Sequence, residues 1–184
     1  MDDLIPKLSQ EEMAPELVAM LRPRVERLGY LGEFFRYTAH QPQALMSFLD
    51  FTEYLKRALP NNLTEVVALT VAAFMSNAYE RVQHERLSLK LGFGKAWVRE
   101  VLSIRPEAAV NMSPAEIDVQ QLTLAVLERR GHNTQRELKV VIRAIGHQRA
   151  IAVLMLVGRY STHALIVNSL ALAPPVKSPL DEDE

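Results

Sequence analysis

Glu80 and His84, four residues apart, are the two side chains in this sequence best suited to chemistry. With Asn77, they would lie on one face of a helix, where residues three and four apart are neighbours. A carboxylate beside an imidazole raises the pKa of the ring and selects its tautomer, which prepares a general acid or base near neutral pH. The pattern also has a plain structural interpretation, because a Glu–His pair at this spacing is a common helix-surface contact and an acid at the third helical position is ordinary capping. The spacing leaves both interpretations open.

Glu65 can join this pair only if the chain turns back between them. In one straight helix, Glu65 and His84 would lie about 28 Å apart at roughly 1.5 Å per residue, too far to share a proton. A break is available, because Asn77 and Glu80 have the spacing of an N-cap and its acid. We therefore predict two helices that meet near Ser76.

Helix-capping patterns punctuate the whole chain. A polar N-cap residue followed three residues later by an acid satisfies the free amide groups at a helix start. Apolar residues between these patterns recur at helical spacing. We predict an all-α, single-domain bundle of about eight helices. Glu65 is the acid of one of these capping patterns, so it too has a structural interpretation. The four patterns begin at Ser9, Asn62, Ser113 and Thr134.

The composition excludes several classes of function. The chain has 184 residues, no cysteine and a net charge of −1. The missing cysteines exclude disulfides, thiolate metal sites and thiol peroxidase chemistry. The basic residues are scattered and do not form the footprint of a nucleic-acid-binding surface. The five histidines lack the spacing of a metal site, and the sequence has no glycine-rich phosphate loop, so we expect neither a metal nor another cofactor.

Two stretches near the C-terminus differ from the rest of the chain. Residues 150–173 are apolar enough to span a membrane, but Arg159 lies near the middle with His163 one turn on, so we predict a buried helix instead. Two roles stay open for Arg159, namely binding of a substrate carboxylate and a buried ion pair or oligomer contact. Residues 174–184 contain three prolines and four terminal acids, which predicts a disordered acidic tail after a domain of residues 1–173.

The start of the chain bears on location. It has neither the basic beginning nor the apolar stretch of a secretion signal, and it lacks the arginines of a transit peptide. We therefore expect a cytoplasmic protein with no membrane partner.

Residues 63–92 resemble the central signature of the carboxymuconolactone decarboxylase and alkylhydroperoxidase D-like superfamily. Peroxidase-type members carry a glutamate, two cysteines and a histidine. Glu65 and His84 stand at the glutamate and histidine positions, whereas Asn77 and Glu80 replace the cysteines. The run from Tyr79 to His84 is similar to the cysteine-free members. The resemblance covers roughly residues 29–173, strongly in the centre and weakly toward the C-terminus.

The resemblance implies a function as well as a fold. It indicates a cofactor-independent lyase or isomerase that acts on a small carboxylated, lactone or carbonyl substrate. In that scheme His84 is the general acid or base, Glu80 orients it, and Glu65 takes part in the catalytic site. Peroxidase activity is not expected, because both cysteine positions hold other residues.

Further expectations concern the substrate pocket and the assembly. Asn77 and Tyr79 are the candidate substrate-binding residues of the central segment. His40 is a third candidate, because it precedes a helix start where an extended residue can point into a cleft, although a histidine in a surface loop is the plain alternative. The superfamily implies a homo-oligomer, a trimer or hexamer. The alternative function is a non-catalytic small-ligand-binding or oligomeric scaffold protein of the same fold.

Overall fold

All regular secondary structure in the described part of the chain is helical. The computed structural model of the protein describes residues 4–181, and within this range there are nine α-helices and two short 3₁₀ helices. The all-α prediction is confirmed, with nine helices in place of about eight. The chain divides into two compact units, residues 1–53 and 54–184, which are described separately below. The single domain of residues 1–173 stays a prediction.

The first unit consists of the 3₁₀ helix η1 (Gln10–Glu12), α1 (Pro15–Leu28), α2 (Glu33–Thr38) and most of α3 (Pro42–Ala58). Two ion pairs connect segments of this unit. Lys7 lies 2.6 Å from Glu33, and Arg24 lies 2.6 Å from Glu53, so the start of the chain is joined to α2 and α1 is joined to α3. Gly29 ends α1 in the left-handed conformation that glycine adopts at little cost.

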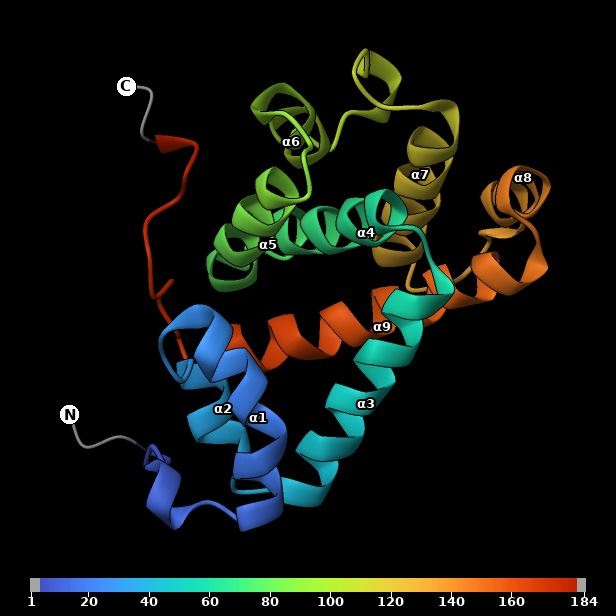
Figure 1. The fold of residues 1–184 in the computed structure, drawn as a ribbon. Coiled ribbons are helices and arrows are strands. Elements are labelled where there is room, and N and C mark those ends of the chain that lie inside the picture. Colours follow the sequence, from blue (N-terminus) through green and yellow to red (C-terminus); the bar gives the residue numbers. More distant parts are fainter. Residues whose placement is uncertain (1–3, 182–184) are drawn as a thin grey trace. The chain divides into compact units, whose positions relative to one another are not determined.

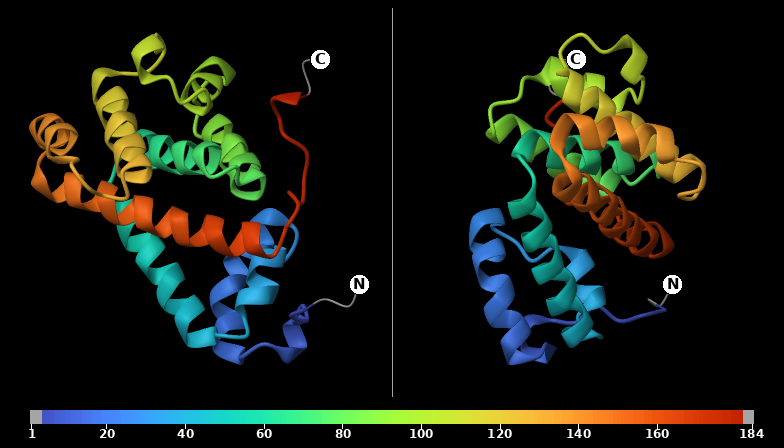
Figure 2. Two further views of the ribbon diagram at one scale, coloured as in Figure 1. Left: turned by 180° about the vertical axis from the view of Figure 1, so that it is seen from behind. Right: turned by 90° about the vertical axis from the view of Figure 1, so that its right-hand side faces the viewer.

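The second unit is built around one buried helix, α4 (Asn61–Phe74). Every side chain from Leu63 to Ala72 is buried, which is the pattern of a helix surrounded on all sides. It packs against α5 (Ala78–Lys90), α6 (Lys95–Leu102), α7 (Pro114–Glu128) and α9 (His147–Ser169), as Figures 1 and 2 show from three sides. The remaining elements are η2 (Pro106–Ala108), which contacts α7, and α8 (Gln135–Ile145), which contacts α7 and α9.

The predicted break between the two halves of the central segment is confirmed. α4 ends at Phe74, and Ser76 then takes a left-handed conformation with φ of 53°. Asn77 caps α5, because its side-chain oxygen accepts a hydrogen bond of 3.1 Å from the amide of Glu80. The chain therefore reverses between α4 and α5, which pack against each other.

The capping role proposed for Asn62 is wrong. α4 begins at Asn61, two residues earlier than such a cap would place it, and Pro60 occupies the N-cap position. The side-chain amide of Asn62 instead donates a 2.7 Å hydrogen bond to Glu116 at the start of α7. The packing of α7 on α4 brings Glu116 to Asn62, and a hydrogen bond to a carboxylate is stronger than a bond to a neutral backbone group. As a result, Glu65 is not needed at the helix start and its carboxylate is available elsewhere.

The apolar stretch near the C-terminus forms α9. By length and composition this helix is able to cross a membrane, but 56% of its most apolar window is buried inside the protein. It packs on α4, α7 and α8 and carries the buried residues Arg159 and His163. The prediction of a buried core helix agrees with this placement.

The tail differs from the expected disorder over residues 174–181. Ser178 is buried and donates a 2.6 Å hydrogen bond to Glu85 on α5. Glu85 is itself almost fully buried, and Arg81 lies 3.3 Å from it. A buried carboxylate needs such donors, which gives this part of the tail a defined place. The acidic end, residues 182–184, lies outside the described residues.

Candidate active site

Glu65, on α4, provides the first half of the candidate site. Its side chain is 1% exposed, at the level where α4 faces α5. One carboxylate oxygen, Oε2, lies 2.7 Å from Nδ1 of His84 and accepts a 3.1 Å hydrogen bond from the hydroxyl of Ser88. The reversal of the chain after α4 thus brings Glu65 within hydrogen-bonding distance of His84, which one straight helix would not do.

His84 lies between two carboxylates. While Nδ1 faces Glu65, Nε2 lies 3.5 Å from Oε1 of Glu80, one turn earlier on α5. A ring nitrogen that faces a carboxylate has to carry a proton, because the ionised carboxylate accepts hydrogen bonds only. Both nitrogens therefore carry protons, and the geometry favours the imidazolium form of His84.

Glu80 also contacts two side chains of α9, Arg159 and His163, which are not among the predicted catalytic residues. Arg159 donates a 2.9 Å hydrogen bond to Oε1, the oxygen that faces His84. His163 places Nε2 at 3.3 Å from the other oxygen, Oε2. Glu80 thus connects helices α5 and α9 and lies between two histidines.

Asn77 determines the tautomer of His163. Because the Oδ1 atom of Asn77 accepts from the amide of Glu80, the other end of its side chain is the donor, and Nδ2 lies 3.4 Å from Nδ1 of His163. Nδ1 is then an acceptor, so the proton of the neutral ring lies on Nε2 and points toward Glu80. His163 thus has one donor and one acceptor as neighbours, unlike His84.

The electrostatics agree with these protonation states. Burial lowers the pKa of His84, but Glu65 and Glu80 outweigh it and raise the pKa from 6.5 to about 9. Burial also lowers the pKa of His163, to about 4. Glu80 acts in the opposite direction, but Arg159 and His84 add to the lowering. Burial raises the pKa of Glu80, yet His163, His84 and Arg159 hold it well below 4.5.

Aromatic rings enclose the charged groups. Tyr160 packs its ring edge-to-face with His84, at 5.1 Å between centroids, and lies under the guanidinium of Arg159 at 4.3 Å. Tyr79, a candidate substrate-binding residue, is buried with its ring 6.1 Å from that of His163. The polar cluster is therefore shielded from water by rings on α5 and α9.

Part of this cluster was predictable from the sequence. The structure brings together Glu65, Asn77, Glu80 and His84, which were predicted to share a site. His40 lies in the first unit, where it is exposed and its Nε2 is 2.8 Å from the carbonyl of Pro6. Its membership in the site stays a prediction.

Two residues were missed as catalytic candidates, and both come from α9. Arg159 and His163 are four residues apart in an otherwise apolar run, which places them on one helix face. This spacing was the only feature of the sequence that could have indicated the two residues. Their contact with Glu80 on α5 depends on tertiary packing.

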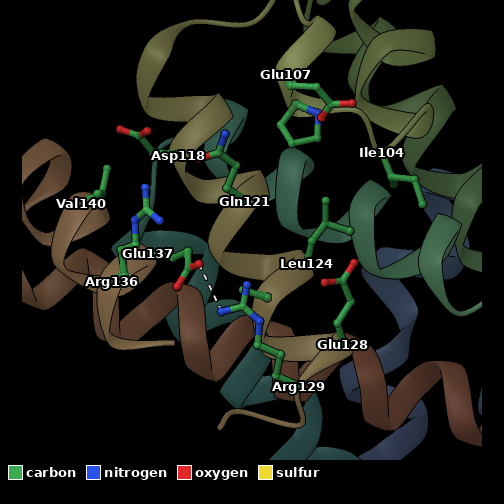
Figure 3. A pocket seen from close by; sticks show the side chains of 12 residues that line it. Ile104, Glu107, Asp118, Gln121, Leu124, Glu128, Arg129, Arg136, Glu137 and Val140 are labelled. Atoms are coloured by element: carbon green, nitrogen blue, oxygen red, sulfur yellow. Dashed lines mark hydrogen bonds and ion pairs between the residues drawn. The ribbon is translucent and has the colours of Figure 1, made fainter. Parts of the chain in front are cut away.

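A separate cavity of about 460 Å³ lies between α7 and α8 (Figure 3). Its wall includes Asp118, Glu128, Arg129 and Arg136, and Arg129 pairs with Glu137 at 3.2 Å. None of the predicted site residues lines it. Within residues 4–181, no group of three or more histidine, aspartate or glutamate side chains is arranged to hold a metal ion.

Solved structures with the same fold differ strongly from this chain in sequence. The debrominase Bmp8 in its apo form aligns over 100% of both chains, with a TM-score of 0.83 and 15% identity. A cysteine-to-alanine variant of that debrominase, in complex with 2,3,4-tribromopyrrole, gives a TM-score of 0.82 at 15% identity over 100% of this chain and 99% of its own. An alkylhydroperoxidase AhpD core protein, an uncharacterized peroxidase-related protein from Ralstonia eutropha JMP134, aligns over 92% of this chain and 90% of its own, with a TM-score of 0.81 and 13% identity. No family model and no curated protein matches the chain.

The resemblance recognised in the sequence is thus confirmed at the level of fold. At identities of 13% to 15%, the likeness carries no information on substrate or reaction. The chemistry has to be argued from the buried cluster itself.

Proposed function

We propose that this chain, which has the AhpD-like fold, is a cofactor-independent enzyme that transfers a proton to a small carboxylated, lactone or carbonyl substrate. The observation that carries the proposal is the position of His84 between Glu65, at 2.7 Å, and Glu80, at 3.5 Å, in a buried cluster. Burying four charged groups is costly, so such clusters are concentrated at functional sites.

His84 is the proton donor in this proposal. Its pKa of about 9 keeps the ring protonated at neutral pH. The Nε2 proton is the transferable one, because its 3.5 Å contact with Glu80 is long and a substrate atom can replace it. After transfer, the neutral ring retains its shorter hydrogen bond from Nδ1 to Glu65.

A substrate with its own electron sink needs no cofactor. In a butenolide with a carboxylate on the γ-carbon, the bond to the carboxylate breaks and its electron pair enters the conjugated lactone, which releases carbon dioxide. The resulting dienolate takes the Nε2 proton of His84 on carbon and becomes the neutral lactone. Decarboxylation is the lyase form of the proposal, and a proton shift within an unsaturated lactone is its isomerase form.

A small substrate is compatible with this fold, and the sequence of this chain excludes thiol chemistry. The debrominase variant holds 2,3,4-tribromopyrrole, so a related fold accommodates a small ring compound. This chain contains no cysteine, and Asn77 and Glu80 stand where the resemblance places cysteines. The proposal therefore rests on histidine and carboxylate chemistry alone.

The test is turnover of the γ-carboxy butenolide by wild type, His84→Gln, Glu65→Gln and the control His132→Asn, which changes an exposed histidine. We expect decarboxylation by wild type and the control, with a loss of about 100-fold or more in His84→Gln. Circular dichroism checks that each variant is folded. Equal activity of a folded His84→Gln variant would refute the proposed role.

A non-catalytic scaffold is the second candidate function. The same contacts join three helices, because Glu65 comes from α4, Glu80 and His84 from α5, and Arg159 from α9. In this case wild type neither decarboxylates the butenolide nor gains thermal stability from it. His84→Gln would then lower only the melting temperature.

A further inference from the structure

The two histidines of the cluster share a carboxylate, Glu80, at Nε2 but differ in the group that faces Nδ1. His84 has carboxylates at both nitrogens, 2.7 Å and 3.5 Å away. His163 has a carboxylate at Nε2 and an amide donor at Nδ1, 3.3 Å and 3.4 Å away. One ring is thus arranged to hold an extra proton, and the other is arranged to remain neutral. Both are at least 95% buried, so solvent does not remove this difference.

We propose that His163 is the proton acceptor of the site and that, with His84 as donor, it enables the enzyme to isomerise unsaturated lactones by a 1,3-proton shift. This inference rests on the proposed function, because it uses the same site and the same donor. It adds a catalytic residue on α9 and specifies how the isomerase form of the reaction takes place.

The step balances in protons and electrons. Nδ1 of His163 removes a proton from the α-carbon of a β,γ-unsaturated butenolide, and the electron pair of that C–H bond enters the conjugated system to give a dienolate. Nε2 of His84 then donates its proton to the γ-carbon, which gives the α,β-unsaturated isomer. After the product leaves, solvent takes the Nδ1 proton of His163 and returns a proton to Nε2 of His84, which restores the initial state.

Glu80 makes the exchange of charge between the two rings possible. Before the reaction the positive charge is on His84, near Oε1, and after it the charge is on His163, near Oε2. The same carboxylate compensates the charge in both states. Arg159, 2.9 Å from Oε1, holds this carboxylate in place. A pair of groups with opposed proton affinities is the arrangement that acid–base enzymes use, and the pKa values of about 9 and about 4 agree with it.

Asn77 covers the acceptor atom, Nδ1 of His163, when no substrate is bound. Its Nδ2 atom occupies the lone-pair side of Nδ1 at 3.4 Å, a distance at the limit of hydrogen bonding. A substrate C–H group that enters there displaces a weak contact. The N-cap bond of Asn77 to Glu80 holds the amide in the orientation that leaves Nδ1 as an acceptor.

The reactions of two butenolides allow this inference to be tested separately from the proposed function. Decarboxylation of the γ-carboxy butenolide yields the dienolate without a base, so it needs His84 alone. Isomerisation of the β,γ-unsaturated butenolide α-angelica lactone needs an acceptor as well. The variant is His163→Gln, because glutamine retains an N–H group for Glu80 but does not take up a proton, and His163→Asn is the second variant. His132→Asn is again the matched control.

We expect His163→Gln to lose isomerisation by about 100-fold or more and to lose much less of its rate of decarboxylation, because only isomerisation needs a proton acceptor. In deuterium oxide, wild type incorporates deuterium into the isomerised lactone and the variant does not. Equal isomerisation by a folded variant, an equal loss of both reactions, or no isomerisation by a wild type that decarboxylates would each overturn the inference alone. Failure of wild type in both reactions would overturn the proposed function.

A measurement without substrate tests the acceptor role of His163 independently. Nitrogen-15 shifts of the histidine rings at neutral pH report which nitrogens carry protons. We expect both nitrogens of His84 to be protonated and only Nε2 of His163. A doubly protonated His163, or a proton on its Nδ1 alone, overturns the acceptor role whether or not the lactones react.

Discussion

The histidine environments illustrate how much a residue's chemistry depends on its neighbours. The sequence correctly identified Glu80 as a partner of His84 and predicted that a carboxylate would raise the pKa of this ring. The stronger partner is Glu65, nineteen residues away in sequence and 2.7 Å away in space. The four-residue pair alone, at 3.5 Å, is the weaker of the two contacts.

His84 makes the stability of the fold depend on pH. Its pKa rises from 6.5 to about 9 on folding, so its contribution is complete below pH 6.5 and is lost as the pH rises through 9. The groups that face it are Glu65 from α4, Glu80 from α5, and the α9 residues Arg159 and His163 that share Glu80.

We expect wild type to lose on the order of 3 kcal/mol of unfolding free energy between pH about 6.5 and about 9.5. Urea unfolding at both pH values measures this, with His84→Gln as the comparison. The variant should lack this part of the decline. A wild type whose stability stays constant over the interval would contradict the raised pKa.

At the scale of the element, the turn between α4 and α5 is the decisive feature. Three residues, Met75 to Asn77, reverse the chain, and Asn77 both caps α5 and contacts His163 on α9. One side chain thus connects the start of a helix with the protonation of a residue 86 positions away. Capping patterns were informative where the partner is local, as in Ser113 and Glu116, whose reciprocal bonds are both present.

Asn77 allows the capping role to be separated from the contact with His163. Asn77→Ala removes the acceptor for the amide of Glu80, so we expect a loss of about 1 to 2 kcal/mol in unfolding free energy. Asn77→Asp retains an acceptor at the N-cap but no longer donates to Nδ1 of His163. It should therefore retain more stability than the alanine variant and raise the pKa of His163.

Chemical denaturation and nitrogen-15 titration measure these two effects. A pKa of His163 that stays near 4 in Asn77→Asp would show that the amide does not influence this ring.

At the scale of the whole molecule, α9 has two different faces. One carries Arg159 and His163 into the buried cluster. The other exposes Ile151, Met155 and Leu165, which are 54%, 45% and 59% exposed and lie on one side of the helix by their spacing. An uncharged apolar stripe of this kind is typical of a protein contact surface.

We propose that this stripe joins copies of the chain in a homo-oligomer, a trimer or hexamer as the resemblance implies. Light scattering should then give a multiple of the 20.8 kDa chain mass. Met155→Lys should shift the protein toward the monomer, whereas the control Lys139→Glu, an exposed change on α8, should not. A monomeric wild type at micromolar concentration would contradict the proposal. The cytoplasmic location stays a prediction.

The sequence by itself determined the features that depend on near neighbours along the chain. The helical class, the break near Ser76, the cap at Asn77 and the burial of the stretch around Arg159 all follow from local spacing and composition. Capping bonds and helical periodicity act over about four residues, so they can be read directly.

Only the tertiary structure decided which distant groups share a proton. Asn62 leaves its predicted cap because α7 offers Glu116, and Ser178 orders part of the tail because α5 offers the buried Glu85. His163 joins the site because α9 packs on α4 and places it 3.3 Å from Glu80 of α5. The energy of a buried charge depends on every group around it, and those groups come together only when the helices pack.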